Sequence, residues 1–104
     1  MAANKDYAAQ LGRAWAYHRQ GNNDGAIQEF TAVLNSDGSN LDALYGLGLA
    51  QRASGKSSLA VETFGKLRGL VATSLQENPG TDRFEMLERM VNQRLAELEG
   101  NLTV

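Results

Sequence analysis

Cysteine is absent from the 104-residue chain, and proline, histidine and tryptophan each occur only once. Without cysteine the chain has no disulfide, no thiolate nucleophile and no cysteine-ligated metal, and the single His18 cannot form a multi-histidine metal site. The chain also lacks a large excess of either charge, since it has 10 Lys and Arg and 12 Asp and Glu. It therefore offers no general attraction for a phosphate backbone. We therefore expect no metal, no cofactor and no nucleic-acid partner.

Long apolar runs are also missing. The best candidate, residues 41–50, contains Asp42 and is shorter than the ~18 apolar residues that a membrane span requires. Residues 1–6 are short and polar, unlike a secretory signal. We expect no membrane span and a cytoplasmic location. With 42% apolar residues, the chain can form the core of one small domain over residues 1–104.

The sequence does contain apolar residues at spacings of three and four, which is the pattern of amphipathic helices. Five such segments are separated by turn signals, and none alternates as a strand does, so we expect an all-α domain. The expected helices are residues 6–20, a helix capped by Asn23 or Asp24 that runs to the turn at 35–40, residues 41–53, a helix capped by Ser57 or Ser58 that ends before the break at 76–80, and residues 81–99.

The chain also repeats itself with a period of 34 residues. The identical pairs at this offset are Ala16 and Ala50, Gly21 and Gly55, Ala26 and Ala60, and Phe30 and Phe64. Small and aromatic residues recur because a small residue admits a facing helix and a ring fills the remaining space. Each unit is therefore expected to be a helix, a glycine turn and a second helix.

In these residues the chain resembles the tetratricopeptide repeat family, whose unit is a helix–turn–helix of 34 residues. The matching positions are Ala14, Tyr17, Gly21, Ala26, Phe30 and Val33 in the first unit, and Leu44, Leu47, Gly48, Gly55, Ala60, Phe64 and Leu67 in the second. The resemblance implies a right-handed α-α superhelix of two repeats, at residues 7–40 and 41–74.

The last helix, residues 81–99, is expected to cap the stack, because repeat units bury their faces on neighbours and the final one needs a polar outer side. Its apolar stripe is Phe84, Leu87, Val91, Leu95 and Leu98, thickened by Met86 and Met90. Arg83, Arg89 and Arg94 are interleaved with glutamates, which predicts local ion pairs. The alternatives are a degenerate third repeat and one strand of an intermolecular coiled coil.

In the family that the chain resembles, the first helix of each unit lines a concave groove that holds a partner peptide. Carried over by position, the resemblance implies an apolar floor and a polar rim in this chain. The floor is Leu11, Trp15, Tyr45 and Leu49, the rim is His18, Arg19 and Arg52, and the lining also includes Ala8, Gly12, Asp42, Gly46 and Ala53. Alternatively, Trp15 and Tyr45 belong to the core or lie under the chain's own last helix.

Chaperone-binding members of that family hold a terminal carboxylate with Lys, Asn and Arg side chains. The matching positions here are Leu11, Trp15 and Gly46, with Gln76 and Gly80 beyond them, and none of these can form that clamp. Recognition of a C-terminal acidic peptide by that mechanism is therefore excluded.

We interpret the chain as a non-catalytic interaction module, a scaffold or adaptor that binds an apolar or amphipathic peptide or helix of a protein partner in the groove. His18 has no carboxylate at helical spacing, so we expect neither an enzyme nor a small-molecule substrate. The alternative function is self-association, with the groove filled by the chain's own helix or that of a second copy. Gly65 and Gly69 within one helix favour either very close packing or a weak point that permits such an exchange.

Overall fold

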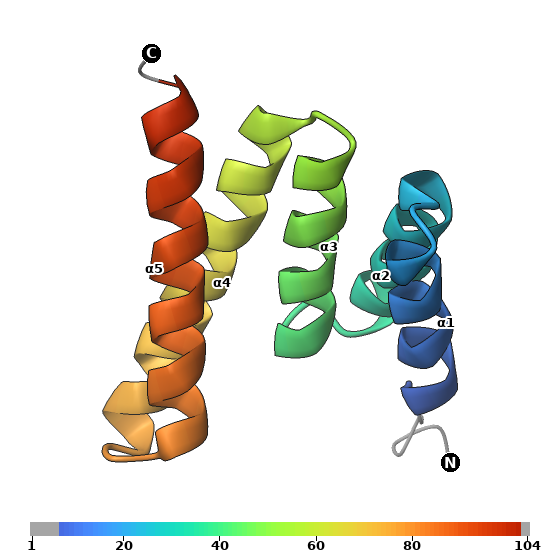
Figure 1. Ribbon diagram of the computed structural model, residues 1–104. Coiled ribbons are helices and arrows are strands. Elements are labelled where there is room, and N and C mark those ends of the chain that lie inside the picture. Colours follow the sequence, from blue (N-terminus) through green and yellow to red (C-terminus); the bar gives the residue numbers. More distant parts are fainter. Residues whose placement is uncertain (1–6, 103–104) are drawn as a thin grey trace.

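The computed structural model describes residues 7–102, in which the chain forms five α-helices and no strand. The helices are α1 (Ala8–Arg19), α2 (Asn23–Ser36), α3 (Leu41–Ala53), α4 (Ser57–Glu77) and α5 (Asp82–Leu102) (Figure 1). Residues 1–6 and 103–104 lie outside the described residues. Two expectations fall on residues 1–6, namely the start of the first helix at residue 6 and the absence of a secretory signal. The expected all-α fold is confirmed, and no described helix combines the length and apolarity needed to cross a membrane.

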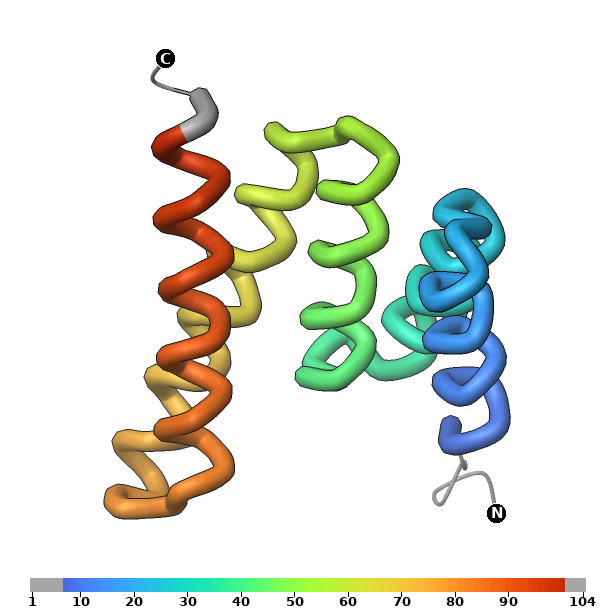
Figure 2. Tube along the Cα trace, viewed as in Figure 1, coloured from blue at the N-terminus to red at the C-terminus, as the bar shows by residue number. Residues whose placement is uncertain are grey.

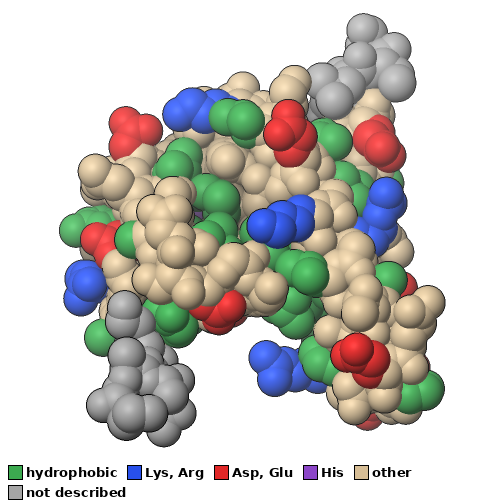
Figure 3. Space-filling model, turned by 180° about the vertical axis from the view of Figure 1, so that it is seen from behind, with side chains coloured by type: hydrophobic (Ala, Val, Ile, Leu, Met, Phe, Trp, Pro, Cys, Tyr) green, Lys and Arg blue, Asp and Glu red, His purple; other side chains and the backbone are tan. Residues whose placement is uncertain are grey.

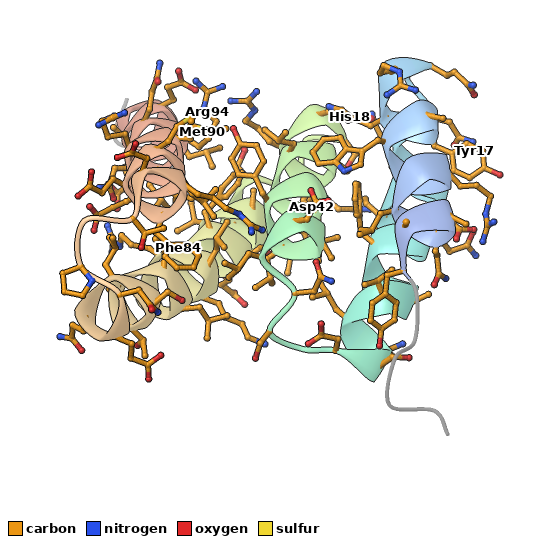
Figure 4. The ribbon with its side chains drawn as sticks, turned by 90° about the horizontal axis from the view of Figure 1, so that it is seen from below. Tyr17, His18, Asp42, Phe84, Met90 and Arg94 are labelled. Carbon is orange, nitrogen blue, oxygen red and sulfur yellow. The ribbon has the colours of Figure 1, made fainter. Side chains whose placement is uncertain are left out.

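Consecutive helices pack against one another, and α1 also contacts α3. The chain rises in α1, α3 and α5 and descends in α2 and α4 (Figure 2). Seen from below, α1, α3 and α5 form one layer, and α2 and α4 form the other (Figure 4). The molecule is therefore a flat slab of two helical layers, with principal extents of 50 × 36 × 19 Å.

The same turn closes both helix–turn–helix units. Gly21 and Gly55 have φ of 79° and 82°, a region that glycine enters without steric cost. In the first unit the amide of Asn22 donates to the carbonyl of Tyr17 at 2.9 Å, and in the second the amide of Lys56 donates to the carbonyl of Gln51 at 2.8 Å. Both are Schellman turns, which end a helix and satisfy its last carbonyls.

Asparagine side chains cap two of the helices. Oδ1 of Asn22 accepts from the amide of Gly25 at 3.0 Å, and Oδ1 of Asn40 accepts from the amide of Ala43 at 2.9 Å. The predicted caps were wrong for α2, whose cap precedes Asn23, and for α4, whose cap position holds Lys56 and makes no side-chain bond. The repeat explains both errors. The cap position directly follows the turn glycine in each unit, so it falls on Asn22 and on Lys56. Ser57 and Ser58 then lie inside the first turn of α4.

Two phenylalanines hold α3 between its neighbours. Phe30 of α2 and Phe64 of α4 are fully buried. A Cβ on Gly46 would overlap the Phe30 ring, and a Cβ on Gly48 would lie 2.5 Å from Cε1 of Phe64. The absence of side chains at these two positions therefore allows α2 and α4 to approach α3 from two sides.

The last two helices form a long hairpin, because α4 continues to Glu77, beyond the residue 74 at which the second repeat was expected to end. Val91, Leu95 and Leu98 of α5 are buried in one core cluster with Phe64, Leu67 and Val71 of α4, and Phe84 and Leu87 of the same stripe are half-buried. The expected apolar stripe of the last helix thus packs on α4.

The structure removes one alternative for this hairpin and corrects one expectation. Gly65 and Gly69 are not sites of close packing, since nothing lies within 4 Å of a Cβ built at either position, and the weak point that was the other alternative stays a prediction. Met86 and Met90 do not thicken the buried stripe, because they are 51% and 36% exposed. Both lie beside the stripe, on the side of α5 that faces α3 across a pocket.

Candidate protein-binding groove

A pocket of about 310 Å³ lies between α3 and α5. Its lining is mainly apolar and consists of Leu41, Asp42 and Tyr45 from α3 and Arg83, Met86, Leu87 and Met90 from α5. The pocket exists because α5 packs on α4 rather than directly on α3, so the two helices of the same layer leave a gap that their side chains only partly fill. We call this gap and its ends the α3–α5 groove.

The two walls of the groove differ, because the α3 wall is packed against the core and the α5 wall is exposed. Tyr45 is half-buried, and its ring lies 5.8 Å from that of Phe64, which fixes the α3 wall. Met86 and Met90 on the α5 wall are exposed. Methionine is unbranched and polarizable, so these two side chains can adapt to the shape of an apolar group placed between them.

Three arginines border the groove. At one end, Nη1 of Arg52 is 2.9 Å from Oε1 of Glu97, and Nη2 of Arg94 is 3.2 Å from Oε2 of the same carboxylate. At the other end, Arg83 lines the pocket and makes no ion pair with any described residue. Met90 and Arg94 lie on one side of α5 (Figure 4).

Trp15 joins the first unit to the second. Its Nε1 donates to Oδ1 of Asp42 at 3.2 Å, and its ring packs edge-on against Phe30 with centroids 5.1 Å apart. His18 packs edge-on against Trp15 at 5.9 Å, and its Nδ1 is buried with no hydrogen-bond partner in the described part of the chain. The indole is therefore half-buried between α1 and α3 and already has a polar partner.

Of the seven residues that the resemblance placed on the floor and rim, Tyr45 lines the pocket and Arg52 lies at the Glu97 end of the groove. Leu49 is half-buried against the same core cluster as Tyr45. Leu11, Trp15 and His18 are half-buried on α1, and Arg19 is exposed there. Gly46 was placed wrongly in the lining, because it is buried beneath the Phe30 ring.

The sequence reasoning missed Arg83, Met86 and Met90 as groove residues. The three residues are spaced by three and four, which is a signal for one helix side. Because they lie next to the buried stripe, the methionines were assigned to that stripe and Arg83 to the solvent-exposed side. The predicted ion pairs are found only at Arg94, since Arg83 and Arg89 have no carboxylate partner among residues 7–102. No group of three or more His, Cys, Asp or Glu in that range could hold a metal.

The opposite face offers a less apolar site. Seen from behind, it shows acidic and basic side chains scattered among hydrophobic ones (Figure 3). A second pocket of about 390 Å³ is lined by Asp24, Ile27, Gln28, Thr31, Ala32, Asn35 and Lys56. Ile27 and Ala32 are its only apolar residues, so the α3–α5 groove is the better candidate for binding apolar groups.

Comparison with known families matches the tetratricopeptide repeat over residues 2–40 and 11–73. No curated protein and no solved structure matches the chain. The longer family match spans more than half of the sequence, covers most of the two helix–turn–helix units and ends before α5. The matched residues contain both Schellman turns and both phenylalanines that hold α3. The chain therefore belongs to the tetratricopeptide repeat family.

Proposed function

We propose that this chain is a cytoplasmic, non-catalytic scaffold or adaptor module that binds an apolar or amphipathic segment of another protein in the α3–α5 groove. Tetratricopeptide repeats generally mediate protein–protein interactions. The observation that carries the proposal is the pocket between Tyr45 and the exposed side chains of Met86 and Met90.

Binding in this groove would work by burial of apolar surface. A pocket of about 310 Å³ accommodates one or two bulky side chains of a partner. Tyr45 offers a rigid wall held by Phe64, whereas the methionines close around the inserted group. Leu11, Trp15, His18, Arg19 and Leu49 would extend the contact surface toward α1, as the family resemblance implies.

A peptide selection tests this proposal. A random-peptide display library is selected against the full chain and, in parallel, against a chain with Met86→Glu and Met90→Glu. The matched control is Leu59→Glu, because Leu59 is an apolar residue of α4 that is 47% exposed and lies outside the pocket. Circular dichroism confirms that each variant keeps its helices.

We expect the wild-type and Leu59→Glu chains to enrich the same peptides, rich in bulky apolar residues, and the methionine variant to lose them. The buried charges of two glutamates would oppose insertion of an apolar group. A set of enriched peptides that the methionine substitutions leave unchanged would rule out the α3–α5 groove as the binding site.

A second copy of the chain is the other candidate occupant, favoured by the exposure of Met86 and Met90 on a surface that no described segment covers. Sedimentation velocity over a wide range of concentrations separates the two. A monomer at all concentrations supports an external partner. A dimer that forms on concentration and is abolished by Met86→Glu supports self-association.

A further inference from the structure

The following inference rests on the proposed function and specifies the partner. We propose that the segment bound in the α3–α5 groove carries carboxylates on both sides of its apolar residues, and that one of these carboxylates replaces Glu97 between Arg52 and Arg94.

The charges around the groove favour an acidic partner. Arg52, Arg83 and Arg94 contribute three positive charges, and Glu97 is shared by two of them. Asp42, the second carboxylate of the groove, accepts from the Trp15 indole and keeps its negative charge. Three arginines against two carboxylates leave the groove with one net positive charge although the whole chain carries a net charge of −2, and its unpaired guanidinium is that of Arg83.

The order of the residues along α5 sets the spacing between charged and apolar groups. A rise of about 1.5 Å per residue places the backbones of Arg83 and Arg94 about 16 Å apart. Met86 and Met90 lie between them and line the pocket together with Tyr45. The groove thus presents a guanidinium, an apolar pocket and a pair of guanidinium groups in sequence. A partner segment of about five extended residues or about eleven helical residues spans this distance.

Glu97 is the chain's own carboxylate at one end of the groove. Its carboxylate already occupies the position between two guanidinium groups where an external carboxylate would bind. The Glu97 side chain is 42% exposed, and ion pairs exposed to that degree are weak and exchange readily with solvent. Glu97 therefore acts as an internal ligand that an acidic partner displaces.

The test adds two chains to the peptide selection, Arg83→Gln and the matched control Arg68→Gln. Arg68 is exposed on α4 outside the pocket, so both variants lose one positive charge but only one loses it in the groove. We expect peptides from the wild-type and Arg68→Gln chains to carry more Asp and Glu beside their apolar residues than the input library. Peptides selected on the Arg83→Gln chain should lose this excess of Asp and Glu on one side of their apolar residues.

An enriched acidic peptide and its Glu→Gln counterpart are then titrated by fluorescence anisotropy. Arg83→Gln should lower the affinity for the acidic peptide by about threefold to tenfold. For the wild-type chain, a higher salt concentration should reduce the difference in affinity between the acidic and the neutral peptide. Glu97→Gln should raise the affinity for the acidic peptide by about threefold, because the carboxylate that competes within the chain is removed. The control Glu99→Gln, exposed on the same helix, should have no effect.

The outcomes separate this inference from the proposed function. Peptides that depend on Met86 and Met90 but show no acidic bias would leave the groove as a binding site and overturn the charge requirement. Weaker binding to Glu97→Gln would overturn the displacement step and show that Glu97 only positions α5. A complete lack of peptides that depend on the methionines would contradict both proposals together.

Discussion

Gly46 and Gly48 show how a single missing side chain determines helix packing. Residues two apart on a helix point in nearly opposite directions, so one glycine admits Phe30 and the other admits Phe64. The sequence repeat pairs Gly48 with Ala14, which is buried and still has a Cβ. Glycine is therefore needed where Phe64 approaches α3, whereas the matching position of α1 keeps an alanine.

We predict that Gly48→Ala lowers the free energy of unfolding by about 1–3 kcal/mol, because its Cβ would clash with the Phe64 ring. Gly65→Ala and Gly69→Ala serve as controls in a neighbouring helix, where the added methyl group meets nothing within 4 Å. These two substitutions should instead raise stability by about 0.5–1 kcal/mol each, since glycine is a poor helix former. Urea unfolding followed by circular dichroism measures all three, and equal signs at Gly48 and Gly65 would contradict the packing argument.

Trp15 gives a second prediction at this scale. Asp42→Ala removes the acceptor of the indole N–H, so acrylamide should quench Trp15 fluorescence more strongly than in the wild-type chain. Stability should fall by about 0.5–1.5 kcal/mol, the usual net contribution of one hydrogen bond. Glu62→Ala, which removes an exposed carboxylate on α4, is the control and should leave quenching unchanged. If both variants are quenched alike, the hydrogen bond does not protect the indole.

Among whole elements, α5 completes the core although it lies beyond the family match. Its buried stripe covers Leu67 and Val71 of α4, which would otherwise face solvent. The side of α5 that carries Glu85, Asn92 and Glu99 is exposed. One buried and one polar side are what a capping helix requires, and the cap expected at residues 81–99 stays a prediction.

We predict that Leu95→Ala destabilises the chain by about 2–4 kcal/mol, because Leu95 is 3% exposed and its removal leaves a cavity between α4 and α5. Leu59→Ala makes the same chemical change at an exposed position of α4 and should cost less than about 1 kcal/mol. Thermal and urea denaturation provide the comparison. Similar losses at the two sites would mean that α5 is not packed as described.

Helix caps supply the next prediction. Asn40→Ala should cost about 1 kcal/mol, because Oδ1 of Asn40 accepts from the amide of Ala43 at the start of α3. Ser57→Ala should be neutral or slightly stabilising, since Ser57 lies inside the first turn of α4 and does not cap it. Denaturant midpoints distinguish these cases, and a loss at Ser57 as large as that at Asn40 would restore the serine cap that the sequence suggested.

At the scale of the whole molecule, two core clusters meet at α3. Leu44 belongs to the cluster shared with α4 and α5, and Leu47 belongs to the cluster shared with α1 and α2. Because one helix contributes to both, the repeats should unfold together even though each unit contacts only its neighbours.

This coupling can be measured through Trp15, which packs against the cluster of α1, α2 and α3, whereas Leu95 belongs to the other cluster. We predict that Trp15 fluorescence and the helical circular dichroism signal give coincident unfolding curves, and that Leu95→Ala shifts both to the same extent. Leu59→Ala again provides the reference. A Trp15 transition that stays in place while the circular dichroism curve moves would show that the two clusters unfold independently.

The sequence by itself determined the local structure. Periodic apolar residues located five helices, with α3 placed at 41–53 as observed, and the glycines repeated at 34 residues identified both turns. These features depend on neighbours within one or two turns of the chain, which is why they can be inferred from spacing alone. The family and the all-α fold follow from the same residues.

Only the tertiary structure decided which side of each helix remains open. Met86 and Leu87 are adjacent apolar residues, yet one is exposed and the other is half-buried, because α5 rests on α4 and a pocket separates it from α3. Arg52 and Glu97 are far apart in the sequence and meet only through that same packing. The groove is made by the distance between α3 and α5, and no local pattern encodes a distance between two helices that do not follow one another in the chain.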